Sequence, residues 1–334
     1  VVDIWGGHTD ESKTTPWQGD TIINVWSTTK TMLALSALIL ADRGEIDLHA
    51  PVAKYWPEFA ANGKEGIEVR HLLSHTAGLS GWEEPMQIDD LYDWDLACAR
   101  LAAQAPWWEP GTASGYHAVT EGYLVGEVIR RASGVSMGEF FRREVAEPLG
   151  LDFHIGTPPE CDDRIALVIP PPPLDFSGAS SELAEKMMNP PLDATVSHTI
   201  PWRRAEIPAA NGHGNARSVA LAQSIISNEG TLNGHTFLSA AGVDALFEQQ
   251  SYGTDLVLGT PIRFGMGYGL NSAEMPLSVN PRTCFWGGWG GSIVVNDVDA
   301  HITFSYVMNK MGEGTTGDLR GGGLLFAFMA GLAG

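Results

Sequence analysis

The chain has 334 residues, 44% of them hydrophobic, which is enough to bury a sizeable core in one large domain or two closely packed ones. Twenty basic residues stand against forty acidic ones, and the resulting net charge of −20 repels nucleic acid and anionic membrane surfaces. We therefore expect no nucleic-acid partner and no membrane partner. Three cysteines without CxxC spacing indicate neither a disulfide framework nor a zinc site, which favours a reducing, cytoplasmic location.

The first predicted elements are two short strands, over residues 1–6 and 21–26. Residue 1 is not a methionine, and the chain begins in mid-strand without a visible signal sequence. We therefore expect the natural protein to have further residues upstream.

Residues 31–41 are apolar on all sides, which predicts a helix buried in the middle of a domain. Ser27 lies at or next to the N-cap of this helix, and Lys30 follows three residues later on the same face. Burial and the positive helix N-terminus both disfavour an ammonium, so a neutral Lys30 amine could accept the Ser27 proton. An ordinary serine N-cap explains the spacing about equally well, but the apolar surroundings of Lys30 favour a nucleophile beside its base.

Three helices are expected next, over 48–59, within 67–82, where the helix ends at Gly78, and over 89–104. His71 and His75 lie four residues apart on the second of them, a spacing that metal-binding helices also use. No glutamate stands where a zincin helix needs its base, so we expect ordinary core histidines.

An aromatic loop over 107–118 ends on Tyr116, just before a helix predicted over 119–132. Loops of this kind carry function more often than core helices do. On its residues alone, Tyr116 is more simply explained as a core tyrosine whose hydroxyl bonds to the backbone.

The segment 134–138 matches the G-x-S-x-G nucleophile pattern of α/β-hydrolases. A nucleophile elbow joins a strand to a helix, whereas this segment follows one helix and opens another. Ser136 followed by Glu139 is also a capping box. We therefore expect Ser136 to be an N-cap residue.

The second half of the chain changes from loops and helices to strands. Residues 156–202 are loop-rich, with prolines at 170–173, and we expect this segment to fold over a pocket. The elements predicted after it are helices over 218–229 and 237–250, strands over 265–270, 282–286, 291–298 and 300–309, and a closing helix over 321–332.

Strands at both ends with helices between them predict an α/β protein of the α+β type. We expect an antiparallel sheet built from both termini and flanked by helices, in a domain of residues 1–47 and 255–334. A mostly helical domain, 48–254, would be inserted in it, with the proline-rich loop covering the active-site cleft.

Six segments, in this order, resemble the serine β-lactamase/penicillin-binding-protein superfamily: STTK at 27–30, HLLSHTAGL at 71–79, WEPGTASGYHAVTEGYLVGEVI at 108–129, EPLGLD at 147–152, NGHGNARS at 211–218 and FWGGWGGS at 285–292. Within it, the chain is similar to the family VIII carboxylesterases, which are esterases on a class C β-lactamase-like fold. The resemblance implies a β-lactamase/transpeptidase-like fold with the active site between the sheet and the helical domain.

The resemblance also implies roles for single residues. Ser27 matches the acylated nucleophile of the family, Lys30 its general base, and Tyr116 the tyrosine that shares protons with both. Backbone N–H groups of Ser27 and Trp289 would form the oxyanion hole.

Two positions depart from the β-lactamase pattern. Trp286 stands where β-lactamases have the lysine of Lys-Thr-Gly, and Ala118 stands where they have asparagine. The groups that hold a lactam's carboxylate and amide are therefore missing. The residues expected to bind substrate are Trp107, Trp108, His117, Trp286, Gly287 and Gly288.

These observations predict a serine carboxylesterase that hydrolyses small neutral, short-chain acyl esters through an acyl-enzyme on Ser27, without a metal or cofactor. The alternatives are a β-lactamase or D-amino peptidase/amide hydrolase of the same fold, or a non-catalytic penicillin-recognising protein.

Overall fold

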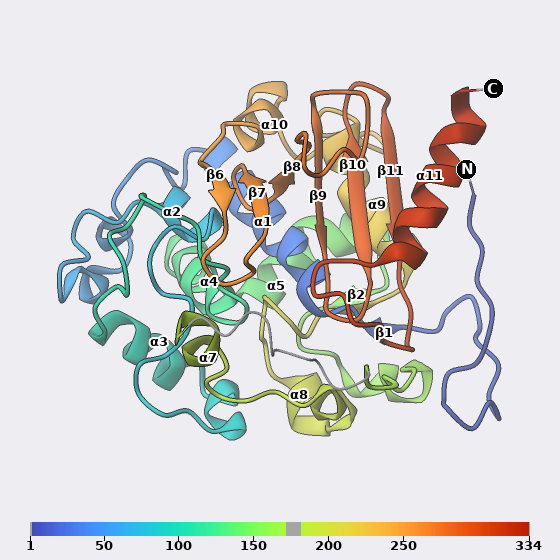
Figure 1. Ribbon diagram of the computed structural model, residues 1–334, viewed down its shortest axis with the longest axis horizontal. Coiled ribbons are helices and arrows are strands. Elements are labelled where there is room, and N and C mark those ends of the chain that lie inside the picture. Colours follow the sequence, from blue (N-terminus) through green and yellow to red (C-terminus); the bar gives the residue numbers. More distant parts are fainter. Residues whose placement is uncertain (1, 172–181, 334) are drawn as a thin grey trace.

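The computed structural model describes residues 2–171 and 182–333, and helix α1, Lys30–Asp42, lies at its centre (Figure 1). Each residue from 32 to 40 is at most 1% exposed. Such a helix has no polar face to turn to solvent. It packs against α4, α5, α9 and α10, which confirms the buried helix predicted from the sequence.

The main sheet has six antiparallel strands in the order β11-β10-β9-β8-β7-β6. Figure 1 shows α11 in front of this sheet and α9 behind it, and every residue of β9 and β10 is buried. Strands covered on both faces read as continuous apolar runs, which is why the last strands could be predicted. The strand bounds are β6 Ser251–Thr254, β7 Pro261–Phe264, β8 Gly269–Leu270, β9 Thr283–Gly287, β10 Ile293–Asp297 and β11 Ile302–Tyr306.

The predicted fold class is confirmed. The strand expected over 1–6 is wrong, since residues 2–6 form no strand. Val1 lies outside the described residues. Val2 is 69% exposed and Ile4 77%, and no backbone hydrogen bond joins residues 2–6 to another described segment. A strand needs a neighbour that pairs its backbone groups. All six strands of the main sheet therefore come from the C-terminal part of the chain.

The N-terminal part contributes to a smaller sheet. Its three strands, in the order β1-β3-β2, are β1 Ile23–Asn24, β3 His213–Gly214 and β2 Phe153–His154. A separate hairpin pairs β4, Thr231–Leu232, with β5, His235–Thr236. The β1 strand leads directly into the turn before α1, so this sheet anchors the chain just ahead of Ser27.

Helices fill the region beside the sheet, on the left of Figure 1. The helix predicted within 67–82, with its end at Gly78, is wrong in length. It ends at Leu73, and His75, just beyond the C-cap residue Ser74, has a left-handed backbone (φ 60°) that cannot continue it. The helix bounds are α2 Val69–Leu73, α3 Trp94–Ala103, α4 Thr120–Ser133, α5 Met137–Phe141, α6 Glu147–Leu149, α7 Glu182–Met187, α8 Ile200–Arg204, α9 Ala216–Ser227, α10 Ala240–Leu246 and α11 Leu319–Ala333.

The division into a sheet domain, 1–47 with 255–334, and a helical domain, 48–254, stays a proposal. Helix α9 belongs by sequence to the second range, yet it packs on β10 and β11 of the sheet. Part of the loop expected to cover the cleft, residues 172–181, lies outside the described residues.

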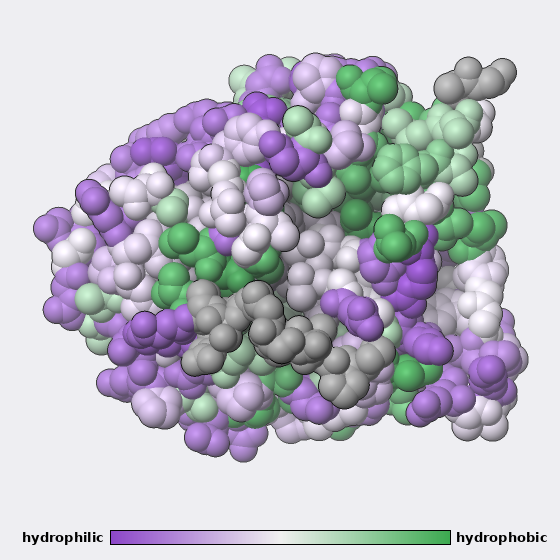
Figure 2. Space-filling model, in the orientation of Figure 1, coloured by the Kyte–Doolittle hydropathy of each residue, from purple (hydrophilic) through white to green (hydrophobic). Residues whose placement is uncertain are grey.

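Helix α11 carries apolar side chains on its outer face. Leu324, Phe326 and Leu332 are each about half exposed, and Figure 2 shows a green band of hydrophobic residues along this helix. Among the described helices, none is both long and apolar enough to cross a membrane.

Candidate active site

Ser27 lies in a short 3₁₀ helix, Trp26–Thr29, directly before α1. It is 9% exposed, and its hydroxyl does not cap α1, because the N-cap residue is Thr29 and no side chain caps it. The preceding Trp26 has a left-handed backbone, with φ of 49°, which is costly for a bulky side chain. The ordinary N-cap explanation of Ser27 therefore has no support in the geometry.

Two polar side chains converge on Ser27. Lys30 Nζ lies 3.2 Å from Ser27 Oγ, and the Tyr116 hydroxyl donates to Ser27 Oγ at 2.7 Å. Lys30 Nζ also donates to two backbone carbonyls, Ala118 O at 2.6 Å and Ala209 O at 2.9 Å.

These contacts determine what a neutral Lys30 can do. Burial lowers the pKa of Lys30 to about 7. A neutral amine has two N–H donors and one lone pair, and the carbonyls of Ala118 and Ala209 can only accept. Both N–H groups of the neutral amine then donate to these two carbonyls. Its lone pair is left facing Ser27 Oγ. The arrangement prepares Lys30 to take the Ser27 proton.

Tyr116 is held in place from several sides. Burial raises the pKa of its hydroxyl, which keeps it protonated and able to donate to Ser27. Its backbone N–H donates to Asp255 Oδ1 at 3.0 Å. Its ring packs edge-on against His75, with 5.0 Å between ring centroids, and at a tilt against Trp286, with 5.4 Å between centroids.

The loop after β9 approaches Ser27 closely. Ser292 Oγ donates to Val25 O at 2.9 Å, and a Cβ added at Gly288 would lie 2.3 Å from Val25 O and 3.1 Å from Ser27 N. Only glycine permits this approach. Within the described part of the chain, the backbone N–H groups of Ser27 and Trp289 have no hydrogen-bond partner, so both are available to an oxyanion.

The residues expected to bind substrate lie in different surroundings. Gly287 packs against the backbone of Thr316, because a Cβ at position 287 would lie 2.4 Å from Thr316 O. His117 is fully buried; its Nδ1 bonds to Gly115 O at 2.7 Å, and its Nε2 accepts from Leu79 N at 3.1 Å. These contacts place both residues in the packing around the site.

The tryptophans differ from one another in exposure. Trp286 is buried behind Tyr116, with 2% of its surface exposed. Trp107, Trp108 and Trp289 are half-buried, and the Trp289 ring contacts Trp26 at 5.0 Å between centroids. The half-buried rings are the ones that can still offer surface to a ligand.

Sequence reasoning missed the two carbonyl acceptors, because every residue has a carbonyl and nothing in the sequence marks those of Ala118 and Ala209. It also missed Glu121, which is 1% exposed at the start of α4. An acidic residue within an apolar stretch was the available signal.

One group of potential metal ligands occurs among the described residues. Atoms of Asp152, His154 and Cys161 lie within 4.8 Å of one another. Arg164 donates to Asp152 Oδ2 at 2.6 Å and to Cys161 Sγ at 3.4 Å. Because the guanidinium already supplies the positive charge that this cluster needs, we assign it no metal.

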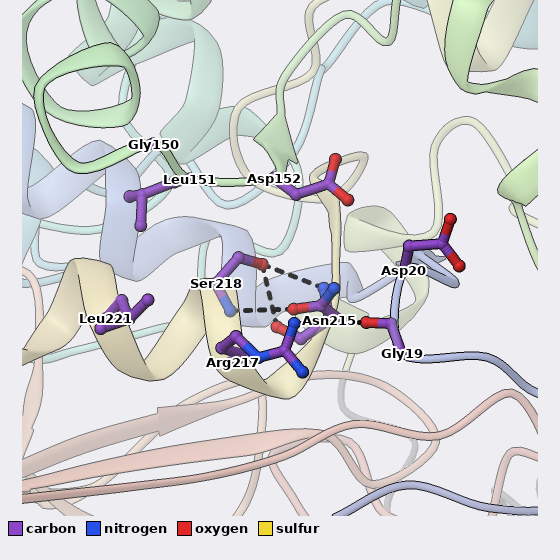
Figure 3. A pocket seen from close by; sticks show the side chains of 9 residues that line it. All are labelled: Gly19, Asp20, Gly150, Leu151, Asp152, Asn215, Arg217, Ser218 and Leu221. Atoms are coloured by element: carbon purple, nitrogen blue, oxygen red, sulfur yellow. Dashed lines mark hydrogen bonds between the residues drawn. The ribbon is translucent and has the colours of Figure 1, made fainter. Parts of the chain in front are cut away.

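Two cavities lie apart from the Ser27 cluster. The smaller, about 120 Å³, lies between the start of α9 and the carboxylates of Asp20 and Asp152 (Figure 3). Asn215 caps α9 there, with its side-chain oxygen accepting from Ser218 N at 2.9 Å. Its lining contains no nucleophile paired with a base, so we assign it no catalytic role.

The larger cavity, about 700 Å³, is lined by residues that include Ser136 and Glu206. Ser136 Oγ accepts from Glu139 N at 3.3 Å and donates to Glu206 Oε1 at 2.6 Å. Ser136 is thus the N-cap of α5, as the sequence predicted.

The chain is similar in sequence and fold to known proteins. A family model described as Beta-lactamase matches residues 1–325. Esterase/beta-lactamase LipL from Mycobacterium tuberculosis is 38% identical over 325 residues, 93% of this chain and 74% of the relative. A crystal structure of a family VIII carboxylesterase is 43% identical, with a TM-score of 0.93 over 99% of this chain and 89% of that one. A penicillin-binding protein homologue from Caulobacter crescentus is 38% identical, with a TM-score of 0.93 over 97% and 87%.

Proposed function

The chain belongs to the Beta-lactamase family and is a serine hydrolase of that fold, and we propose that it is a carboxylesterase acting on small neutral acyl esters through an acyl-enzyme on Ser27. One observation carries the proposal. Two carbonyls use both donors of a neutral Lys30, which leaves its lone pair facing Ser27 Oγ.

In the proposed acylation, Ser27 Oγ attacks the ester carbonyl carbon as its proton moves to Lys30 Nζ. The carbonyl oxygen becomes an oxyanion that accepts from the N–H groups of Ser27 and Trp289. When the tetrahedral intermediate collapses, the bond to the alcohol oxygen breaks. That oxygen receives a proton from the Lys30 and Tyr116 pair, and the alcohol leaves.

Deacylation repeats the same steps with water. A water molecule gives its proton to the neutral Lys30 and attacks the acyl carbon, and the bond to Ser27 Oγ breaks. The proton returns to Ser27 from the Lys30 and Tyr116 pair. The free acid leaves, and no group other than these side chains and the two backbone donors is required.

Supporting evidence for an ester substrate comes from two positions beside the nucleophile. By the resemblance, Trp286 stands where β-lactamases have the lysine that binds a lactam's carboxylate, and Ala118 has only a methyl group where they have the asparagine that binds its amide. The half-buried Trp107, Trp108 and Trp289 are the proposed walls for an apolar acyl group. A series of p-nitrophenyl esters from acetate to laurate tests this, and we expect kcat/KM to be highest for the short chains.

β-Lactam hydrolysis is the second candidate, because the relative from Mycobacterium tuberculosis carries both activities in its name. It would use the same nucleophile and base. Measuring the hydrolysis of a chromogenic cephalosporin beside that of the ester series distinguishes the two activities.

We expect activity to rise with pH through about pH 7. Burial lowers the pKa of Lys30 from 10.5 to about 7, so the amine is protonated below that pH and neutral, able to accept a proton, above it. The logarithm of kcat/KM for p-nitrophenyl butyrate should increase by about one per pH unit below this value and then level off. EDTA should have no effect. A rate that falls over this range, or activity lost on chelation, would contradict the mechanism.

A further inference from the structure

Ser292 ends the loop of residues 288–292 that joins β9 to β10, and Trp289 lies on the same loop, which we call the oxyanion loop. Ser292 is 1% exposed, and its hydroxyl donates to Val25 O at 2.9 Å, across 267 positions of the chain. Val25 lies two residues before Ser27. The loop that carries one proposed oxyanion donor is therefore bonded to the turn that carries the other.

A second hydroxyl extends this connection. Thr28 is fully buried, and its Oγ1 lies 2.9 Å from Ser292 Oγ. A serine hydroxyl has one proton and a carbonyl oxygen can only accept, so the Ser292 proton is used on Val25 O. Ser292 Oγ must then accept the proton of Thr28 Oγ1. The resulting chain of two hydrogen bonds, from Thr28 through Ser292 to Val25, is called the hydroxyl link below.

The turn that the hydroxyl link spans has an unfavourable backbone. Trp26 has a φ of 49°, a left-handed conformation that a bulky side chain keeps only where its surroundings enforce it. The carbonyl just before Trp26, Val25 O, accepts from Thr28 N at 3.2 Å as well as from Ser292 Oγ. One of the two donors that fix this carbonyl therefore comes from the oxyanion loop.

Gly288, the residue before Trp289, packs directly against the hydroxyl link. Its N–H donates to Ser292 O at 2.8 Å within the loop. A Cβ at position 288 would lie 2.3 Å from Val25 O and 2.4 Å from Ser292 Oγ. A displacement of Ser292 is thus passed on to the backbone from which the Trp289 N–H extends.

Resting on the proposed function, we propose that Ser292 and Thr28 are positioning residues of the oxyanion hole. Their hydroxyl link holds the Ser27 turn against the oxyanion loop, and thereby sets where the N–H groups of Ser27 and Trp289 lie relative to each other. Negative charge develops on the ester's carbonyl oxygen only as the transition state is reached. Donors that are held in place therefore lower the barrier without strengthening the binding of the substrate.

Ser292→Ala breaks the hydroxyl link and leaves the nucleophile and its base in place. We expect kcat for p-nitrophenyl butyrate to fall by at least about tenfold while KM changes by less than about twofold, because displaced donors act on the transition state. The rise of activity through about pH 7 should not move, since Lys30 is held by the carbonyls of Ala118 and Ala209. A kcat within about twofold of wild type in folded Ser292→Ala protein, or a shifted pH profile, would overturn the inference.

Two substitutions of Thr28 test the link from its other end, and they apply even if Ser292→Ala does not fold. Thr28→Val keeps the shape without the hydroxyl and should lower kcat by about threefold or more, whereas Thr28→Ser keeps the hydroxyl and should stay within about twofold of wild type. Added to Ser292→Ala, Thr28→Val should cause no further loss, because the Thr28 hydroxyl then has no acceptor through which to act. Equal losses in the two Thr28 variants, or fully additive losses in the double variant, would contradict the proposal.

Ser36→Ala is the matched control for the loss of a buried hydroxyl. Ser36 is fully buried on α1, and its hydroxyl donates to a carbonyl of the same helix, Met32 O, at 2.8 Å. We expect kcat within about twofold of wild type. A loss as large as that of Ser292→Ala would attribute both effects to packing and overturn the inference.

A transition-state analogue gives a readout that does not depend on turnover. A trifluoromethyl ketone forms a tetrahedral adduct on the nucleophile and places an oxyanion at the same two donors. Its affinity for Ser292→Ala should fall by about the same factor as kcat/KM, and an unchanged affinity would contradict the proposal. Absence of ester hydrolysis in the wild type would instead overturn the proposed function.

Discussion

Ser27→Ala should abolish ester hydrolysis, with kcat falling by at least about a thousandfold. Ser27 Oγ is the hydroxyl on which Lys30 Nζ and the Tyr116 hydroxyl converge, at 3.2 Å and 2.7 Å. Removing it leaves the base and the oxyanion donors without an attacking atom. Rates with p-nitrophenyl butyrate, for protein whose melting temperature matches the wild type, provide the measurement.

Ser136→Ala is the control, since Ser136 belongs to the G-x-S-x-G segment that would be the alternative nucleophile. Its hydroxyl caps α5 and bonds to Glu206, so its loss should lower the free energy of unfolding by about 1 kcal/mol and leave kcat within about twofold. If Ser136→Ala is the inactive variant and Ser27→Ala remains active, the proposed site is wrong.

Esters should be preferred over β-lactams by at least about a hundredfold in kcat/KM. A penicillin or cephalosporin carries a carboxylate that needs a cation, and the resemblance puts Trp286 where β-lactamases have that cation. Its amide side chain needs a partner that the Ala118 methyl group cannot supply. Each missing charge-assisted hydrogen bond costs about 1.5 to 3 kcal/mol, so the two together lower acylation by roughly two to four orders of magnitude.

The measurement compares p-nitrophenyl butyrate with nitrocefin on the same preparation. Comparable values would show that another residue recognises the carboxylate. His117 is excluded by its complete burial. Arg320, which donates to Gly290 O at 2.6 Å beside the oxyanion loop, would be the first residue to substitute.

The sequence predicted those parts of the fold that rest on local patterns. A helix apolar on all sides must be buried, and α1 is; continuous apolar runs bounded by turns gave β9, β10 and β11. The strand predicted at the N-terminus is wrong, because a strand depends on a neighbouring strand that the local sequence does not reveal. Strands β6 and β7 were missed for the same reason.

The sequence likewise predicted one part of the candidate site and missed another. The motifs placed Ser27, Lys30 and Tyr116, and the structure brings these three side chains together. The carbonyls of Ala118 and Ala209, which decide where the Lys30 lone pair points, could not be predicted, since backbone acceptors lie 88 and 179 residues from Lys30 in the chain. Glu121 could be seen in the sequence, but only the fold places its carboxyl near His75.

Covalent labelling tests the central claim most directly. A fluorophosphonate reacts with a serine hydroxyl that an adjacent base activates, and the adduct marks the nucleophile by mass. We predict one adduct per chain, on the peptide that contains Ser27, with no labelling of Ser27→Ala and undiminished labelling of Ser136→Ala. An adduct on another peptide, or full labelling of Ser27→Ala, would contradict the account.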